Sequence, residues 1–346
     1  MERSPSQLAL TSARRPTIID VARRAEVSKS VVSRVFSERG KVSAQTRQRV
    51  LDAAAELGYV VNAMARAMVA HRTYTLGVFV RDVATPFYGH LLSAMQERAD
   101  TLGYRVVTAT GSGRFAVEDE LRALETLVMM RVEGLVIGSG LLPAAQILPF
   151  AERVPTVVAG RPETEENFTS VYCDEREGGA ALADHLADLG HRYVAVITLR
   201  KSESLTLAPR TAAMVQELRR RGVEAVRVIG RGVDAADRWV DQILERPEVT
   251  AVMAPSDRYA VRLLEELQRR GVDVPARLSV TGYDGIGELA TPLIGLTHWR
   301  QPIDAIGRSA VDALVALLDS GPPGRPKRHV LSGTLVLGRS TAPPCR

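Results

Sequence analysis

The chain has 346 residues, 45% of them hydrophobic, and a formal net charge of +5. This length supports a small module plus a large two-part core. No apolar run approaches the ~20 residues that span a bilayer, and the first sixteen residues lack the pattern of a secretion signal. Only two cysteines occur, Cys173 and Cys345, far apart in sequence, which argues against a disulfide framework and favours a reducing cytoplasm.

The positive charge is concentrated at the N-terminus. Residues 1–72 hold 13 Lys and Arg against 6 Asp and Glu, a net of +7, whereas the rest of the chain holds 32 against 34, a net of −2. A basic patch confined to one small module favours phosphate contacts over a merely solubilising charge. The alternative is a solvated basic helix pair that docks on protein.

After a flexible tail over residues 1–16, the sequence predicts two short helices around a tight turn in residues 17–36, TIIDVARRAEVSKSVVSRVF. Thr17 and Asp20 resemble a capping box at the start of the first helix. Ser28 is a plausible N-cap for the second helix, which confines the turn to residues 25–27.

The second helix has two different faces. Val32, Val35 and Phe36 fall on one side at helical spacing, and the opposite stripe is small, polar and once positive, with Ser30, Ser33, Arg34 and Ser37. An apolar back and a slim hydrogen-bonding front are what a recognition helix needs to enter the major groove of DNA.

A third helix is predicted over residues 43–57. Val50, Leu51, Ala54 and Leu57 would form its apolar face, and Gly58 would end it in a left-handed conformation. We therefore expect a head at residues 17–60. Residues 61–73 form a linker whose central helix, 62–68, is too short to hold in water and should fold only when something fixes it.

From Thr75 onward, apolar runs alternate with amphipathic helical stretches such as 87–102 and 257–270. Strands are predicted at 75–80, 104–109, 134–138, 155–160, 193–198, 225–229, 250–254 and 278–282. This alternation predicts an α/β body of two doubly wound parallel-sheet lobes over residues 74–340, followed by a tail at 341–346. The cleft between the lobes is the expected pocket.

An enzyme has one motif in its favour. Residues 111–116, from Gly111 to Ala116, satisfy the G-x-G-x-x-A pattern of a dinucleotide site, but the following strand ends in Ser139 where an acid is wanted. Serine-hydrolase, zincin and P-loop signatures are missing, and the histidines are scattered. We therefore expect no catalysis, cofactor or metal.

These motifs together resemble the lactose/galactose-repressor family of bacterial transcription regulators. The match begins at TIIDVARRAEVSKSVVSRVFSERGKVSAQTRQRVLDAAAELGYVVNAMARAM and continues through TLGVFVRDVATPFY, RVEGLVIGS, the LGHRYVAVI region, VMAPSDRYA, RLSVTGYDGI, LTHWRQP and GRST. It covers about 320 of the 346 positions. The resemblance implies a homodimer that binds a near-palindromic operator in double-stranded DNA and a small molecule, such as a sugar or sugar derivative, between its lobes.

The resemblance also implies which residues contact DNA. Base edges would be contacted by Lys29, Ser30 and Arg34, and Lys29 with Ser30 occupies the variable, specificity-setting pair. Phosphate and positioning contacts would come from Thr17, Ser28, Ser33, Ser43, Thr46, Tyr59 and Asn62, with Ala65 and Met68 in the linker facing the minor groove. For the hydroxyl groups, ordinary helix capping is the alternative.

For the small molecule, the resemblance implies a site formed by Phe87, Arg210, Ser256, Asp257, Asp284, Trp299 and Gln301. A guanidinium fork suits a carboxylate, a phosphate or paired hydroxyls. The alternatives are an interlobe ion pair for Arg210, helix capping for Asp284 and a core position for Phe87.

Several positions depart from the family pattern. Met68 stands where most members have a leucine that wedges into DNA, Val61 replaces a proline, and Glu26 replaces a glycine, which predicts that the turn does not need a positive φ. In the pocket, Ser256 replaces an asparagine, and His298 with Trp299 departs from the usual segment. We expect these two residues to reshape the pocket, with His298 as a pH-sensitive group or a buried structural histidine.

Two other classes of protein remain as alternatives. One is a transcription activator with the same head, because the sequence indicates DNA binding more clearly than it indicates whether the protein activates or represses transcription. A periplasmic solute-binding protein would explain the two lobes, but it would require a signal segment and has no use for a basic head. We expect a dimer rather than a tetramer, since no extended heptad follows Thr341.

Overall fold

The computed structural model describes residues 16–37, 42–59, 72–111, 116–163, 168–230, 232, 234–321 and 326–345. The chain forms two compact units, Met1–Thr73 and Tyr74–Arg346. We call the first unit the head and the second the body, and each is described by itself.

The described part of the head contains the helices α1 (Ile18–Arg24), α2 (Lys29–Ser37) and α3 (Ala44–Glu56). Val21 of α1, Val32 and Val35 of α2, and Val50 of α3 are almost fully buried against one another. The Asp20 carboxylate accepts hydrogen bonds from the Thr17 amide at 2.9 Å and the Thr17 hydroxyl at 2.6 Å, which fixes the start of α1. The predicted two-faced second helix is confirmed, because its apolar side forms the core of the head.

Two predictions about the head are wrong. Glu26 has a φ of 55°, so the turn between α1 and α2 does need a left-handed residue and holds a glutamate there at a conformational cost. Leu51 is 41% exposed and does not share the buried face of α3. That face instead includes Ala53, which lies on the same side as Val50.

The first lobe of the body is built on a six-stranded sheet in the order β11-β5-β4-β3-β1-β2, in which every pairing is parallel. Helices α5 and α12 pack against each other on one face, and α6 and α7 lie together on the other. The elements of lobe 1 are β1 (Thr75–Val80), α5 (Pro86–Thr101), β2 (Arg105–Thr110), α6 (Val117–Met129), β3 (Gly134–Gly138), α7 (Ala144–Ala151), β4 (Thr156–Ala159), β5 (Thr169–Cys173), α12 (Ile303–Ser320) and β11 (Arg328–Leu331).

The second lobe has a six-stranded sheet in the order β12-β10-β9-β8-β6-β7, parallel except for the β10–β12 pair. Helices α8 and α9 pack together on one side, and α10 and α11 on the other. The elements of lobe 2 are α8 (Glu175–Asp188), β6 (Tyr193–Thr198), α9 (Leu207–Arg220), β7 (Glu224–Ile229), α10 (Ala236–Leu244), β8 (Ala251–Met253), α11 (Asp257–Arg269), β9 (Ser279–Asp284), the 3-10 helix η1 (Gly287–Ala290), β10 (Thr297–Arg300) and β12 (Thr334–Val336).

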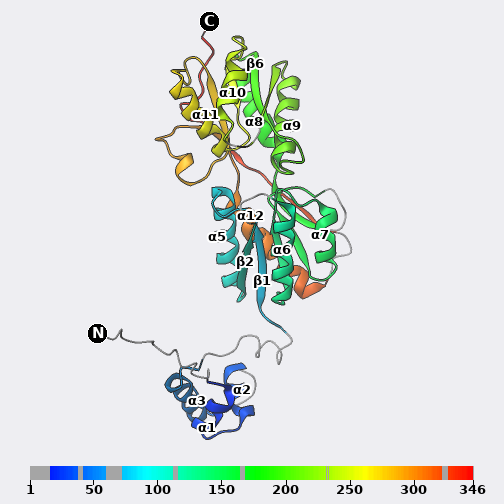
Figure 1. Ribbon diagram of the computed structural model, residues 1–346, viewed down its shortest axis with the longest axis vertical. Helices are drawn as coiled ribbons and strands as arrows, with labels where there is room; N and C mark the ends of the chain where they lie inside the picture. The colour runs from blue at the N-terminus through cyan, green and yellow to red at the C-terminus, as the bar shows by residue number, and fades with distance from the viewer. Residues whose placement is uncertain are drawn as a thin grey trace, which may run out of the picture. The chain divides into compact units, whose positions relative to one another are not determined.

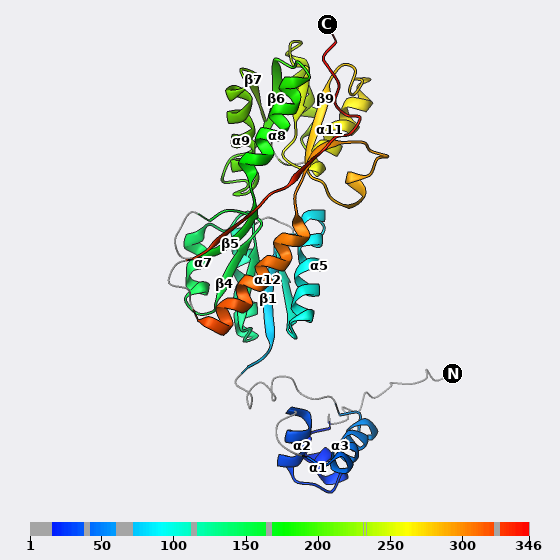
Figure 2. The same ribbon diagram turned by 180° about the vertical axis from the view of Figure 1, so that it is seen from behind.

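The chain passes between the two lobes three times (Figures 1 and 2). It leaves lobe 1 after β5 to form α8, returns after β10 to form α12, and leaves again after β11 to form β12. Two doubly wound lobes with mostly parallel sheets confirm the predicted fold class. The cores are formed by near-continuous apolar strands such as β3, which is buried throughout because helices cover both faces of its sheet.

All eight predicted strands exist, with ends that coincide with the prediction or differ from it by one or two residues. Four short strands, β5, β10, β11 and β12, were not predicted. β11 and β12 lie at sheet edges, where burial does not impose a clear apolar pattern. The last predicted strand extends to Asp284, so this residue ends β9 and does not follow it.

The tail predicted at residues 341–346 is bonded to lobe 2 over the described residues 341–345. The Ala342 amide donates to Ser279 Oγ at 3.0 Å, and the His191 Nε2 proton bonds the Ala342 carbonyl at 3.0 Å. Cys345 Sγ lies 3.0 Å from the Ala276 carbonyl oxygen. The tail lies along lobe 2 because its backbone meets polar groups of β9 and its surroundings. Among the described helices, none is long and apolar enough to cross a membrane.

Candidate functional site

The polar front of α2 is accessible in the head. Ser28, Lys29, Ser30 and Arg34 are exposed, whereas Ser33 is half-buried. Lys29 and Arg34 form no ion pair within the described residues, although Arg34 Nε donates to the Ser30 carbonyl at 3.3 Å. This helix therefore presents two positive charges and two hydroxyls beside one another, as a DNA-reading helix does.

Two of the hydroxyls assigned to phosphate contacts, those of Ser28 and Ser43, also cap helices. Ser28 Oγ accepts from the Val31 amide at 3.3 Å, and Ser43 Oγ accepts from the Thr46 amide at 3.2 Å. The Thr46 and Ser43 hydroxyls lie 2.9 Å apart, and the Tyr59 ring packs 5.8 Å from that of Phe36. The Ser28 and Ser43 bonds fix the starts of α2 and α3. Asn62, Ala65 and Met68 lie outside the described residues.

A cavity of about 690 Å³ lies between the two lobes of the body. It opens where strands end: Arg81 follows β1, Leu199 follows β6, Ser256 follows β8, and Asp284 ends β9. The carboxyl ends of parallel strands are the usual ligand position in such folds. Lobe 1 contributes Arg81, Thr85, Pro86, Phe87, Tyr88 and Leu141, and lobe 2 the rest of the lining, including Arg200, Glu203, Thr206, Arg210, Ser256, Asp257, Arg258, Tyr259 and Asp284.

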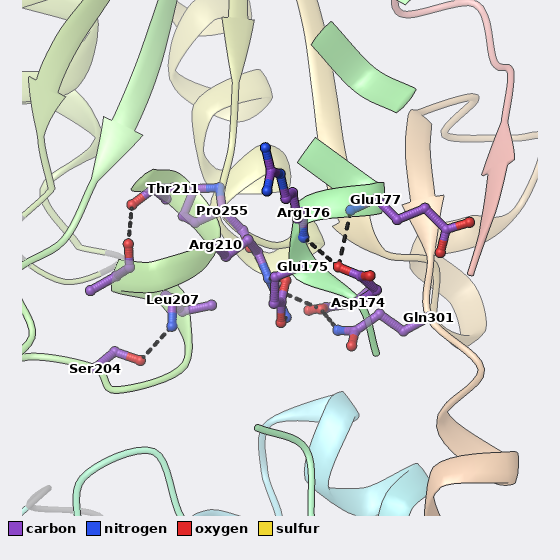
Figure 3. Close-up of polar contacts among 12 residues, drawn as sticks. Asp174, Glu175, Arg176, Glu177, Ser204, Leu207, Arg210, Thr211, Pro255 and Gln301 are labelled. Carbon is purple, nitrogen blue, oxygen red and sulfur yellow. Dashed lines mark hydrogen bonds and ion pairs between the residues drawn. The ribbon is translucent and has the colours of Figure 1, made fainter. Parts of the chain in front are cut away.

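Arg210 is the most constrained side chain of this cavity. It comes from the first turn of α9, and it is only 1% exposed. Its Nε and Nη2 bond the two carboxylate oxygens of Glu175 at 2.7 and 3.0 Å, as Figure 3 shows. Its Nη1 bonds the Pro255 carbonyl at 2.8 Å and Asp284 Oδ1 at 3.0 Å, and its guanidinium carbon lies 3.9 Å from the centre of the Tyr283 ring. The fork is thus held by two carboxylates, as the ion-pair alternative predicts, but both belong to lobe 2.

Asp284 is held in a strained conformation beside Arg210. Its φ is 105°, a value that side-chain-bearing residues rarely adopt. Its Oδ1 also accepts from Gln301 Nε2 at 2.7 Å. Burial raises the pKa of Asp284 to about 6, although Arg210 and Gln301 act in the opposite direction.

Asp257 supports the loop that follows Asp284. Its Oδ2 accepts from the amides of Gly285 at 2.7 Å and Ile286 at 3.3 Å, so the first residue of α11 fixes the end of β9. Burial and the neighbouring charge of Asp284 raise the pKa of Asp257 well above its ordinary value. A ligand in the cavity therefore meets the carboxyl groups of Asp257 and Asp284 beside the guanidinium of Arg210.

The structure brings most of the predicted pocket residues together. Phe87, Arg210, Ser256, Asp257 and Asp284 line the cavity. Gln301 lies behind Asp284 and contacts it directly.

Trp299 is the exception. It is 4% exposed, belongs to the core and is not among the lining residues, so the expectation that it reshapes the pocket is wrong. Its indole ring packs against Gly178 and Gly333, where an added Cβ atom would lie 2.4–2.8 Å from the ring, and neither glycine lines the cavity. His298 is also buried outside the lining, with its Nδ1 proton bonding the Leu296 carbonyl at 2.9 Å. Burial lowers its pKa, which fits the structural alternative for this residue.

Sequence reasoning missed Glu175, which neutralises Arg210, and the polar groups around Arg81. Glu175 begins α8 directly after the first crossing between the lobes. No spacing rule connects it to Arg210, because the two lie 35 residues apart. The middle of the glycine-rich motif, residues 112–115, lies outside the described residues. No cluster of three or more potential metal ligands occurs in the described part of the chain.

Comparison with known proteins agrees with this organisation. A model named "Bacterial regulatory proteins, lacI family" matches residues 17–62, and one for a periplasmic binding protein-like domain matches residues 183–341. The HTH-type transcriptional regulator AscG of Escherichia coli is 30% identical over 339 residues, covering 95% of this chain and 99% of the relative. The HTH-type transcriptional repressor CytR of Escherichia coli is 30% identical and covers 93% of each chain.

Solved structures show the same architecture. The lac repressor dimer bound to operator and the anti-inducer ONPF is similar with a TM-score of 0.83 and 28% identity, over 95% of this chain and 100% of that one. The complex of the regulator CelR with cellobiose has a TM-score of 0.67 and 29% identity, over 94% and 100% of the two chains.

A helical head with an exposed basic reading helix, joined to a periplasmic-binding-protein-like body, defines a DNA-binding transcription regulator. The chain belongs to the lacI family of bacterial regulatory proteins, as the resemblance predicts. It is accordingly a regulator and not an enzyme.

Proposed function

We propose that the protein is a repressor that binds a near-palindromic operator as a homodimer and that a small molecule between its lobes changes its affinity for DNA. The observation that carries this proposal is the cavity itself, which both lobes line. A molecule there contacts both lobes at once and favours the lobe geometry that it fits. It changes DNA affinity only as far as it binds the two geometries differently.

The nature of the small molecule follows from the cavity lining. Carboxyl groups of Asp284 and Asp257 surround the Arg210 guanidinium, and the rings of Phe87 and Tyr259 also line the space. Hydroxyl groups bond both carboxylates and guanidinium groups, and aromatic rings cover the faces of a sugar. We therefore propose a sugar or a sugar derivative, and the cellobiose complex of CelR is a precedent in a similar body.

Relatives support the DNA-bound form. The similar lac repressor was solved as a dimer on its operator, and CytR is named a repressor. We propose that Lys29, Ser30 and Arg34 contact the DNA bases. The hydroxyl groups of Ser28 and Ser43, which also cap helices, would contact phosphates. Since its target is chromosomal DNA, we place the protein in the cytoplasm. An activator with the same head is the second candidate, because AscG is named only as a regulator.

The test is selection of bound sequences from random duplex DNA by the full-length protein, followed by affinity measurements. Lys29→Ala should relax base preference at one position of each half-site by about 1–3 kcal/mol. Lys327→Ala is the matched control, because Lys327 is exposed on lobe 1. Unchanged specificity in Lys29→Ala would refute the assignment of this residue. Reporter expression with and without the protein then separates a repressor from an activator.

A further inference from the structure

The two lobes of the body are joined by three short crossings. The first is Asp174, between β5 and α8, the second is formed by residues 301–302, between β10 and α12, and the third by residues 332–333, between β11 and β12. The Asp174 amide donates to the carbonyl of Leu331, the last residue before the third crossing, at 3.0 Å. The first and third crossings therefore lie against each other, and any turn of one lobe against the other must pass through both.

Trp299, which is the last residue but one of β10, fills the space beside these crossings. Its indole ring packs between Gly178 of α8 and Gly333 of the third crossing. A Cβ atom added to Gly333 would lie 2.5 Å from the ring atom Cε2, and one added to Gly178 would lie 2.7 Å from the ring atom Cδ1. The space that side chains would fill at these two positions is thus occupied by the ring, which is wedged between segments from both sides of the hinge.

The apolar core is continuous through this point. The buried cluster that contains Trp299 also contains Cys173, the last residue of β5 in lobe 1, and Tyr283 of β9 in lobe 2. Among the described residues, the two other buried clusters of the body each stay within a single lobe. Burial raises the pKa of the Cys173 thiol to about 11, as expected for a group removed from water. Turning the lobes therefore disturbs buried contacts around Trp299 as well as surface contacts.

Trp299 also lies one strand away from the cavity proposed for the small-molecule effector. In the parallel pair β9–β10 it is the register partner of Tyr283, so the two side chains share one face of the sheet. A Cβ atom added to Gly178 would meet both side chains. The guanidinium carbon of Arg210, which lines the cavity, lies 3.9 Å from the centre of the Tyr283 ring. Arg210, Tyr283 and Trp299 thus lead in this order from the cavity to the crossings.

We propose that Trp299 is a wedge that holds the crossings against one another, so that the lobes turn only when its packing opens, and that it thereby affects the affinity for DNA. The part of this proposal that concerns DNA rests on the proposed function. Packed interiors change between discrete arrangements and do not deform continuously. Trp299 is therefore a positioning residue, which acts through the crossings and does not line the cavity.

The test compares Trp299→Phe with Trp239→Phe in the full-length protein. Trp239 is the other tryptophan of the chain, is fully buried, and belongs to a cluster confined to lobe 2. Hydrogen exchange is followed in peptides that contain the Asp174 and Gln301 amides, both of which are bonded to backbone carbonyls. In Trp299→Phe these amides should exchange about tenfold faster than in wild type, while the amides of β1 and β6 keep their rates. Trp239→Phe should instead accelerate exchange in α10 and α11.

Equal acceleration at the crossings in both variants, or none in Trp299→Phe, overturns the proposal. Trp299→Leu leaves a larger void and should accelerate the crossings further, and the comparison of the two phenylalanine variants decides the question if the leucine variant folds poorly.

Affinity for an operator selected by wild type is measured on the same preparations without effector. Trp299→Phe should change it by about threefold or more, and Trp239→Phe should leave it unchanged. Faster exchange with unchanged affinity in Trp299→Phe would refute the link to DNA binding. If wild type binds no operator, the proposed function fails, whereas the exchange rates still decide whether Trp299 is a wedge.

Discussion

The amide of Leu205 donates a hydrogen bond of 2.7 Å to the carbonyl oxygen of Gly140, which joins lobe 2 to lobe 1 beside the cavity. Gly140 follows β3 of lobe 1, and Leu205 lies just before α9 of lobe 2. The side chain of Arg258 makes a second connection to Thr85. Two hydrogen bonds therefore connect the two walls of the cavity directly, and the shape of the cavity depends on the distance between the lobes.

Gly140→Ala should weaken this connection. The new methyl group would lie 3.1–3.5 Å from Arg81, Tyr88 and Thr206, so these groups must move apart. We expect a loss of about 1–3 kcal/mol in the free energy of unfolding, as for other overpacked sites, and weaker binding of any effector. Urea denaturation and calorimetry measure both. Gly89→Ala is the control, because its methyl group would have only the Val83 carbonyl nearby, at 3.6 Å. An equal effect of the two substitutions would show that Gly140 has no special position.

Arg210→Met should be strongly destabilising even without effector. It removes the common partner of Glu175 and Asp284, both of which are largely buried. Breaking one side of a buried ion pair typically costs about 3–5 kcal/mol. Arg246→Met provides the comparison, since its contact with Glu248 is 3.9 Å long and exposed and should contribute less than about 1 kcal/mol. Denaturant midpoints and slopes distinguish the two, and similar midpoints would contradict the central role of Arg210.

Stability should depend on pH through Asp284. Its folded-state pKa is raised to about 6 from 3.8, so the folded protein binds this proton more tightly than the unfolded chain does. The resulting contribution to the free energy of unfolding is fully present below about pH 4 and is lost as the pH rises through 6. Wild type should therefore lose stability relative to Asp284→Asn between these values. Asp100→Asn, on the exposed end of α5, should follow wild type. Parallel curves for wild type and Asp284→Asn would exclude the raised pKa.

Glu26→Gly should stabilise the head. Glu26 holds a φ of 55°, which a glycine adopts without the steric cost of a Cβ atom. We expect a gain of about 1 kcal/mol, because left-handed backbone costs other residues roughly 1–2 kcal/mol. Hydrogen exchange of the α1 and α2 amides in the full-length protein measures it. Arg49→Gly, compared with Arg49→Ala, is the opposite control, since Arg49 is exposed in the middle of α3, where glycine lowers stability by a similar amount. Slower exchange in Arg49→Gly than in Glu26→Gly would contradict this view of the turn.

The sequence predicts most of the fold because long buried elements leave a periodic signal. β3 is apolar throughout, and α2 has one buried apolar face and one polar face. Both elements were therefore predicted together with the faces that they bury. Short edge strands such as β11 carry no comparable signal, since the residues of β11 are alternately exposed and half-buried and none of them is fully buried.

The functional site is less predictable, because its contacts join residues that are distant in sequence. Arg210 and Asp284 were expected in the pocket from the resemblance, and both line it. The partner Glu175 was not expected, because only the path of the chain between the lobes brings it to Arg210. Trp299 was assigned to the pocket, but its ring is buried in the core, and its neighbour His298 is buried outside the lining as well. Neither residue of this pair on β10 therefore lines the cavity.

The last two strands of the chain belong to different lobes: β11 completes the edge of the first sheet, and β12 completes the edge of the second. Neither lobe is therefore finished until nearly the whole chain has been synthesised, although the head is made first. A nascent or prematurely terminated chain that ends before residue 327 would carry a complete reading helix on a body that lacks an edge strand in each sheet. Both sheets of such a product would lack their last edge strand, so the C-terminal segment is needed to complete both of the lobes that line the cavity.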